Sequence, residues 1–357
     1  MTLGRNRFRL LAVAITATTA GGLALGFHRC GPVAASPPSM EDLVRRASNE
    51  AGVPARLLWA MAYAETRFVA ESSPDGRRGW IRLVPWKPQR SSRRAAELIG
   101  VPTLALESDP AVSLRGAAAL LAEVGRPLGL GARTPVAAWR PALEQFNDGQ
   151  EALADAVYAE QVVRIAETDA GMDVPHSELP FDSTFEATRV GARWVPFLPA
   201  ASSAYQPFGA EARTIRYIVL HTTQNTFSNI LGYFRVPGTQ VGAHYLLRAS
   251  DGFALQLIDE RAVAFHDRCF NKESIGIEHE GYIDFGSRWY SQAMYRASAH
   301  IVRDVARRHG IPIDRKHILG HGETPDCSEH TDPGPDWDWD QFMALVRETD
   351  ATAGDPK

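Results

Sequence analysis

The 357-residue sequence predicts two successive regions of different fold class, an all-α region followed by an α/β region. Three observations lead to this prediction. Apolar residues recur at helical spacing from residue 40 to about 168, without strand-like alternation. Pro, Ser and Ala are then frequent from 169 to about 209, which is typical of a linker. Beyond it, strand-like runs that end at histidine or glutamate precede a helical segment at 291–309.

The composition is that of a soluble globular protein, with 45% hydrophobic and 22% charged residues. The length is sufficient for two domains of ordinary size. The formal net charge of −4 gives no electrostatic reason to expect a nucleic-acid partner.

The first 35 residues have the order of a secretory signal. Three arginines precede the apolar run 10–27, and Val33-Ala34-Ala35 supplies small residues for cleavage before Ser36. We therefore expect residues 1–35 to be removed and the protein to be exported to the periplasm, cell envelope or exterior, with no membrane span left. Retention as an anchor, or lipidation at Cys30, are the alternatives.

Local signals divide the all-α region into helices. Gly52-Val53-Pro54 breaks the first helix, and Pro110 and Pro135 occupy favoured first-turn positions. The expected helical segments are 40–51, 57–68, 111–124, a segment starting at Thr134-Pro135, and 152–168. The second of these is apolar on every side and carries one carboxylate, Glu65. An unpaired carboxylate there should be neutral or face a cleft.

The motifs Gly52-Val53-Pro54, Glu65-Thr66-Arg67-Phe68 and Phe146-Asn147-Asp148-Gly149 occur in an order similar to that of the soluble lytic transglycosylases, which have a lysozyme-like fold. The resemblance covers residues 39–170 and implies that Glu65 is a glycosidase acid. The chain departs from that family at Arg82, usually glutamine, and at Phe146, usually tyrosine. Either a working glycosidase or a degenerate module that binds glycan or packs on the second region is consistent with this.

The α/β region contains the pieces of a split zinc site. The strand-like run 216–220 stops at His221. Gly320-His321 lies on a turn, and His330-Thr331-Asp332 precedes the turn Pro333-Gly334. Histidine nitrogen and carboxylate oxygen are the ligands that zinc prefers when one position stays open for water.

Several motifs resemble, in the same order, those of the zinc-dependent N-acetylmuramoyl-L-alanine amidases, over about residues 190–345. They are Trp194-Val195-Pro196, Ile218 to Thr223, Gly242-Ala243-His244-Tyr245, Ala264-Phe265-His266, Ser274-Ile275-Gly276-Ile277-Glu278, Gly320-His321 and Thr331-Asp332-Pro333-Gly334. The resemblance implies a mixed β-sheet flanked by helices over 210–349, after a linker at 171–209 and before a short tail at 350–357.

By the same resemblance, one zinc ion per chain is bound by His221, His321 and Asp332. Zinc-activated water would then hydrolyse the amide between N-acetylmuramic acid and L-alanine in peptidoglycan or its fragments. Glu278 is the expected general base, with Glu280 as the alternative, since both would share one face of a strand. His330 stands where many members have a lysine that steadies the oxyanion.

Several other residues allow two interpretations. His244 and His266 match positions near the groove, where each would either contact substrate or make internal hydrogen bonds. Cys269 and Cys327 remain after signal removal, so either one disulfide or two unpaired thiols is expected. We expect a monomer. A bifunctional hydrolase that also cuts glycan, and a peptidoglycan-binding protein without catalysis, are the alternative functions.

Overall fold

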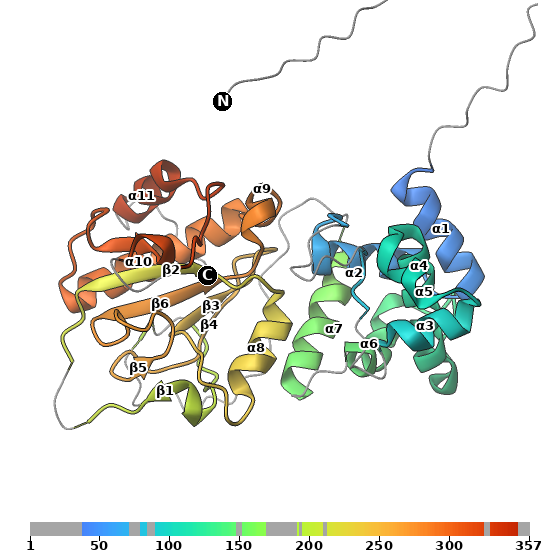
Figure 1. Cartoon of the computed structure of the whole chain (residues 1–357), viewed down its shortest axis with the longest axis horizontal. Helices are drawn as coiled ribbons and strands as arrows, with labels where there is room; N and C mark the ends of the chain where they lie inside the picture. The colour runs from blue at the N-terminus through green and yellow to red at the C-terminus, as the bar shows by residue number, and fades with distance from the viewer. Residues whose placement is uncertain are drawn as a thin grey trace, which may run out of the picture. The chain divides into compact units, whose positions relative to one another are not determined.

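A computed structural model describes residues 38–70, 79–83, 90–147, 152–168, 191–192, 195–209, 213–324 and 329–348. The expected signal segment 1–35 and the expected tail 350–357 lie outside these residues. Ser39 to the C-terminus forms one compact unit, which contains a helical part and an α/β part (Figure 1). In the ranges just given, no helix is both long and apolar enough to cross a membrane.

The described residues before position 169 form helices and no strand, as predicted. The α-helices are α1 Met40–Ala51, α2 Ala55–Thr66, α3 Ser92–Ile99, α4 Thr103–Ser108, α5 Pro110–Gly125, α6 Arg140–Asn147 and α7 Ala152–Glu167. Helices α3 and α4 were not anticipated individually. Their apolar residues join those of α1, α2 and α5–α7 in one hydrophobic core.

Capping residues explain several of these boundaries. The Ser39 hydroxyl accepts the amide N–H of Asp42 at the start of α1, and Gly52 ends that helix in the left-handed conformation. The Asp109 carboxylate accepts the Ala111 N–H at 2.8 Å, and Pro110 begins α5. Of these features, the sequence predicted the break after Ala51 and the start of a helix at Pro110, whereas the cap at Ser39 was not anticipated.

The α/β part is built on a five-stranded mixed sheet. Its strand order is β4-β3-β6-β2-β7, in which only β4 is antiparallel to its neighbour. The strands are β2 Tyr217–Thr222, β3 Tyr245–Leu247, β4 Ala254–Gln256, β6 Ser274–His279 and β7 Ile318–Gly320, and a separate pair joins β1 Tyr205–Gln206 to β5 Val263–Ala264. The helices are α8 Phe227–Arg235, α9 Gly286–Trp289, α10 Gln292–His309 and α11 Trp339–Arg347.

Alternation along the strands separates two faces of the sheet. Ile218 and Leu220 of β2, with Ile275 and Ile277 of β6, pack against α10 and α11 in one core (Figure 1). Leu246 of β3 packs on the opposite side with apolar residues of α8. Because successive side chains point to opposite faces, the residues next to these isoleucines in β2 and β6 point away from the α10–α11 core.

Part of the expected linker belongs to the α/β part. The Leu198 N–H donates to the Gln256 carbonyl at 2.9 Å, and the Ala200 N–H donates to the Leu257 carbonyl at 2.8 Å. Val195 and Ala204 are buried, and β1 pairs with β5. Proline removes a donor only at its own position, so the N–H groups between prolines remain available to cover the edge strand β4.

Buried ion pairs connect the helical and α/β parts of the unit. Arg248, beside β3, lies 3.4 Å from the Glu160 carboxylate of α7 and also pairs with Asp251. Arg67, which follows α2, lies 3.5 Å from the Glu280 carboxylate, which follows β6. Val157 of α7 also packs in the apolar cluster of α8. The helical part is therefore packed on the second region.

Candidate metal centre

The ends of three neighbouring parallel strands bring the predicted residues together. His221 near the end of β2 is the Cα partner of Glu278 in β6. His321 follows directly after β7, which pairs with the other edge of β2. Ligand sites in open α/β sheets lie at the carboxyl ends of the strands, and this is where the three side chains are found.

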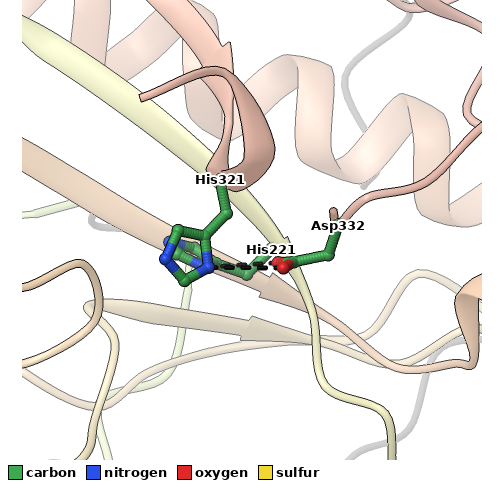
Figure 2. Close-up of side chains that lie close together, drawn as sticks. All are labelled: His221, His321 and Asp332. Atoms are coloured by element: carbon green, nitrogen blue, oxygen red, sulfur yellow. Dashed lines mark hydrogen bonds and ion pairs between the residues drawn. The ribbon is translucent and has the colours of Figure 1, made fainter. Parts of the chain in front are cut away.

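The three candidate ligands converge on one point. His221 Nδ1 lies 3.0 Å from His321 Nδ1. The Asp332 carboxylate oxygens lie 3.4 Å from His221 Nδ1 and 3.3 Å from His321 Nδ1. Figure 2 shows the three side chains pointing toward one another, and their ligand atoms all lie within 4.8 Å.

These separations fit a tetrahedral zinc ion. Ligand atoms about 2.0–2.1 Å from such an ion stand roughly 3.3 Å apart. The two imidazoles and the carboxylate are all buried at this spacing. A cation between them stabilises the lone pairs and the negative charge that would otherwise repel one another. The donor set of two histidines and one carboxylate suits zinc with an open fourth position.

The protonation states are those that a metal ligand requires. Burial alone would raise the pKa of Asp332, but the neighbouring imidazoles of His221 and His321 outweigh burial and hold that pKa far below its usual range. The Thr222 N–H also donates to the carboxylate at 3.2 Å. Burial lowers the pKa of His221. The aspartate is therefore ionised and His221 is neutral at pH 7.

Glu278, the expected general base, has one oxygen without a hydrogen-bond partner among the described residues. This oxygen, Oε2, is buried. Burial, followed by the nearby charge of Asp332, raises the pKa of Glu278 well above its usual value. A carboxyl group held in this way keeps its proton to a higher pH than a solvated carboxyl group does.

Glu280, the alternative base, is engaged by backbone N–H groups and by an arginine. Its two oxygens accept the N–H groups of Phe227 at 2.9 Å and Ala249 at 2.8 Å, and Arg67 lies beside it. It is fully buried. These contacts join α8, β3 and the helical part around one carboxylate, and both of its oxygens are occupied.

His330 lies at the rim of the centre. Its ring stacks on the His321 ring, with centroids 4.1 Å apart and an interplanar angle of 16°. Its side chain is 64% exposed, and Nδ1 lies 3.6 Å from Asp332 Oδ1. The imidazole is thus close to the ligands and accessible to a substrate.

His244 is held by internal hydrogen bonds. It is fully buried, and its Nδ1 accepts the Gly276 N–H at 3.0 Å, while Nε2 lies 3.2 Å from the Ala262 carbonyl. Burial, followed by the charge of Arg213, lowers the pKa of His244 to about 3. Of the two roles left open by the sequence, these contacts favour the internal one.

His266 contacts a candidate ligand directly. Its Nδ1 lies 3.0 Å from His221 Nε2, and its Nε2 lies 3.2 Å from the Ser274 hydroxyl. The next residue, Asp267, places a carboxylate oxygen 3.5 Å from His321 Nε2. Asp267 was not among the predicted site residues. Its adjacency to His266 in the amidase-like motif Ala264-Phe265-His266 was the available signal.

The expectation of an unpaired carboxylate at Glu65 is wrong. Glu65 is 2% exposed and forms an ion pair with Arg90. It also accepts the Tyr158 hydroxyl at 2.6 Å and the Arg82 N–H at 2.8 Å. The cation that neutralises it comes from a segment 25 residues away, which helical periodicity does not reveal. Phe146 lies under the Arg90 guanidinium and is fully buried.

Of the two cysteines expected to form a disulfide, one lies among the described residues. Cys269 lies on the loop between β5 and β6. Cys327 lies outside the described residues, so the Cys269–Cys327 disulfide stays a prediction.

Comparison with known proteins identifies the α/β part. Residues 211–335 match the Amidase_2 family, described as N-acetylmuramoyl-L-alanine amidase. N-acetylmuramoyl-L-alanine amidase A of Achromobacter lyticus is 29% identical over 164 residues, covering 42% of this chain and 90% of that protein. The 1,6-anhydro-N-acetylmuramyl-L-alanine amidase AmpD of Salmonella typhimurium strain LT2 is 36% identical over 117 residues, covering 30% of this chain and 58% of AmpD.

Solved structures also align with this chain. PlyL aligns with 20% identity and a TM-score of 0.33, over 43% of this chain and 97% of PlyL. AmpDh3 from Pseudomonas aeruginosa, in complex with anhydromuramic pentapeptide, aligns with 20% identity and a TM-score of 0.32, over 42% of this chain and 66% of AmpDh3. The family match and the sequence relatives show that the chain carries an enzyme domain, an N-acetylmuramoyl-L-alanine amidase.

Proposed function

We propose that this protein hydrolyses the amide bond between N-acetylmuramic acid and L-alanine in peptidoglycan, using one zinc ion per chain held by His221, His321 and Asp332. The observation that carries the zinc assignment is the convergence of three buried ligand atoms within 4.8 Å, in the part of the chain that matches the amidase family. Zinc bound there would supply an acidified water and polarise the amide carbonyl.

The residues around the ligands have distinct roles in this proposal. Glu278 takes a proton from the attacking water at Oε2 and gives it to the departing amine nitrogen. Its raised pKa suits a group that must both accept and release a proton. His330, exposed beside the ligands, donates an N–H to the oxygen that becomes negative in the tetrahedral intermediate.

The substrate class follows from the relatives. AmpD is named for the 1,6-anhydro-N-acetylmuramyl-L-alanine amide, and AmpDh3 was solved with anhydromuramic pentapeptide. We propose that the present protein acts on peptidoglycan or muropeptides as an exported monomer. The basic and apolar order of residues 1–35 supports export.

The alternative functions have less support. A binding protein without catalysis does not require three converging ligands and a buried carboxyl group beside them. Cleavage of glycan by Glu65 requires a proton donor that faces substrate, whereas both Glu65 oxygens are engaged within the helical part.

The test uses purified sacculi and mass spectrometry of the released products. Full-length protein should release free stem peptides and carry one zinc per chain. His221→Ala, His321→Ala and Asp332→Ala should each abolish release and weaken zinc binding. His317→Ala is the control, because its imidazole bonds Asp314 instead. Full zinc occupancy in all three variants would exclude the ligand assignment.

A further inference from the structure

The dipeptide His266-Asp267 contacts both candidate ligand histidines. It lies on the loop after β5, and its backbone is held by one side chain. Asn271 Oδ1 accepts the His266 N–H at 2.9 Å and the Asp267 N–H at 2.7 Å. One short segment, fixed at both amides, therefore presents an imidazole to His221 and a carboxylate to His321.

The hydrogen bonds that run from the Phe270 carbonyl through Ser274 and His266 to His221 determine which nitrogen of each imidazole carries the proton. The Phe270 carbonyl can only accept, so the Ser274 hydroxyl donates to it, at 2.7 Å. Ser274 Oγ then accepts from His266 Nε2–H. This leaves His266 Nδ1 as an acceptor, and a neutral imidazole carries one N–H. His221 must therefore donate from Nε2, at 3.0 Å, and present its Nδ1 lone pair to the other ligands.

Asp267 favours the same tautomer of His321, with the proton on Nε2. Its Oδ1 lies 3.5 Å from His321 Nε2 and accepts the Thr324 hydroxyl at 3.3 Å. The carboxylate attracts the proton of His321 to Nε2, which leaves Nδ1 as the lone pair facing His221 and Asp332. Hydrogen bonds of this kind fix the tautomer and ring orientation of metal-binding histidines.

The position of His266 explains why residue 276, in the Ile-Gly-Ile-Glu motif, is a glycine. A Cβ atom on Gly276 would stand 2.5 Å from His266 Cγ and 2.7 Å from its Nδ1. Real Cβ contacts are not this short, so the His266 ring occupies the space that a side chain at 276 would need. The absence of a side chain in β6 is what lets His266 reach His221.

We propose that His266 and Asp267 are positioning residues that orient Nδ1 of His221 and of His321 toward a shared metal ion. This inference rests on the proposed zinc site. It reassigns His266 from substrate contact to support of a ligand, and it adds Asp267 to the site.

The test measures zinc affinity of full-length, metal-free protein by competition with a chromophoric chelator. His266→Leu and Asp267→Ala remove the acceptors and should weaken zinc binding by about 10–100-fold. His266→Asn and Asp267→Asn keep an acceptor oxygen and should lose less. His317→Leu and Asp259→Ala are matched controls, because their side chains bond Asp314 and Arg261 instead. Both should bind zinc as wild type does.

A second measurement needs no substitution. Nitrogen NMR of histidine-labelled, zinc-loaded wild-type protein should show His221 and His321 protonated at Nε2. Protonation at Nδ1 would overturn the inference even if the Leu and Ala variants fail to fold. Wild type that binds no zinc would overturn both this inference and the zinc proposal. Tight zinc binding by wild type and equally by His266→Leu and Asp267→Ala would overturn this inference alone.

Discussion

At the scale of single residues, strand β6 gives three neighbouring side chains different surroundings. Glu278 lies beside His221 on one face of the sheet, whereas His279 points to the opposite face and bonds Ser298 of α10 through Nε2. Glu280 accepts two backbone N–H groups and pairs with Arg67. The two carboxylates thus differ in their contacts: both Glu280 oxygens are occupied, whereas Glu278 Oε2 has no hydrogen-bond partner among the described residues.

We predict that Glu278→Gln retains zinc but loses about 10²- to 10⁴-fold in turnover, the range typical of general acid–base catalysis. Gln cannot take the proton from water, while its volume is unchanged. The measurement is the rate of stem-peptide release, with zinc content determined on the same samples.

Glu280→Gln is the matched variant for this prediction. It should keep most of the turnover and lower the melting temperature, since it leaves Arg67 buried without its anion. If Glu280→Gln lost most of its rate of stem-peptide release and Glu278→Gln kept it, the assignment of the base would be reversed.

At the scale of elements, the end of α10 is tied to the loop between β4 and β5. Glu260 is fully buried and receives hydrogen bonds from Arg308 and His309 in the last turn of α10, and from Tyr245 in β3. Burial would raise the pKa of Glu260, but these hydrogen bonds outweigh it and lower the pKa to about 2. Ionised Glu260 therefore stabilises the folded state.

We predict that this contribution is complete above about pH 4.5 and is lost as the pH falls toward 2, because the unfolded chain binds the proton first. The loss amounts to about 3 kcal/mol. Urea unfolding at pH 7, 4.5 and 3 should show Glu260→Gln less stable at pH 7 but less sensitive to acid than wild type. Exposed Glu97→Gln is the control; identical acid sensitivity in wild type and Glu260→Gln would contradict the prediction.

The loop between β5 and β6 carries both the proposed positioning dipeptide and Cys269. We predict a disulfide between Cys269 and Cys327 in exported material, worth about 2–4 kcal/mol. It would join this loop to the segment between His321 and His330. Thiol titration of the denatured, unreduced mature protein should find no free thiol; two free thiols would rule the bond out.

At the scale of the whole molecule, the helical part has its own buried charge cluster. Glu65 forms an ion pair with Arg90 and accepts a hydrogen bond from the Tyr158 hydroxyl, beside the hydrophobic core of the helical part. Its contacts are internal to the helical part. The ion pairs Arg67–Glu280 and Arg248–Glu160 are among the contacts that extend to the amidase domain.

We predict that Glu65→Gln destabilises the helical part by about 3–5 kcal/mol, because Arg90 is left buried without its anion. The rate of stem-peptide release at 25 °C should be unchanged. The measurements are thermal unfolding and mass spectrometry of sacculus digests. Anhydro-muropeptides that appear with wild type and vanish with Glu65→Gln would show that the protein is also a glycosidase.

The sequence alone predicted the order of an all-α and an α/β region, the starts of α1 and α5, and the strand ending near His221. These features depend on neighbours within a few residues: a cap at Ser39 or Asp109, and the unbroken run of β-branched, aromatic and aliphatic residues along β2. The three ligand candidates came from motif order, and the structure brings them together.

What only the tertiary structure decided is which buried charges have partners. Glu65 is neutralised by Arg90, 25 residues away, and bonded by Tyr158, 93 residues away. The contacts of Asp267 with His321 and of Glu280 with Arg67 likewise join distant segments. Local periodicity reports which face of a helix or strand a residue occupies. The partner that satisfies a buried carboxylate there is set by how the segments pack. In the described residues this packing separates Glu280, whose oxygens are both occupied, from Glu278, which has an unpartnered oxygen.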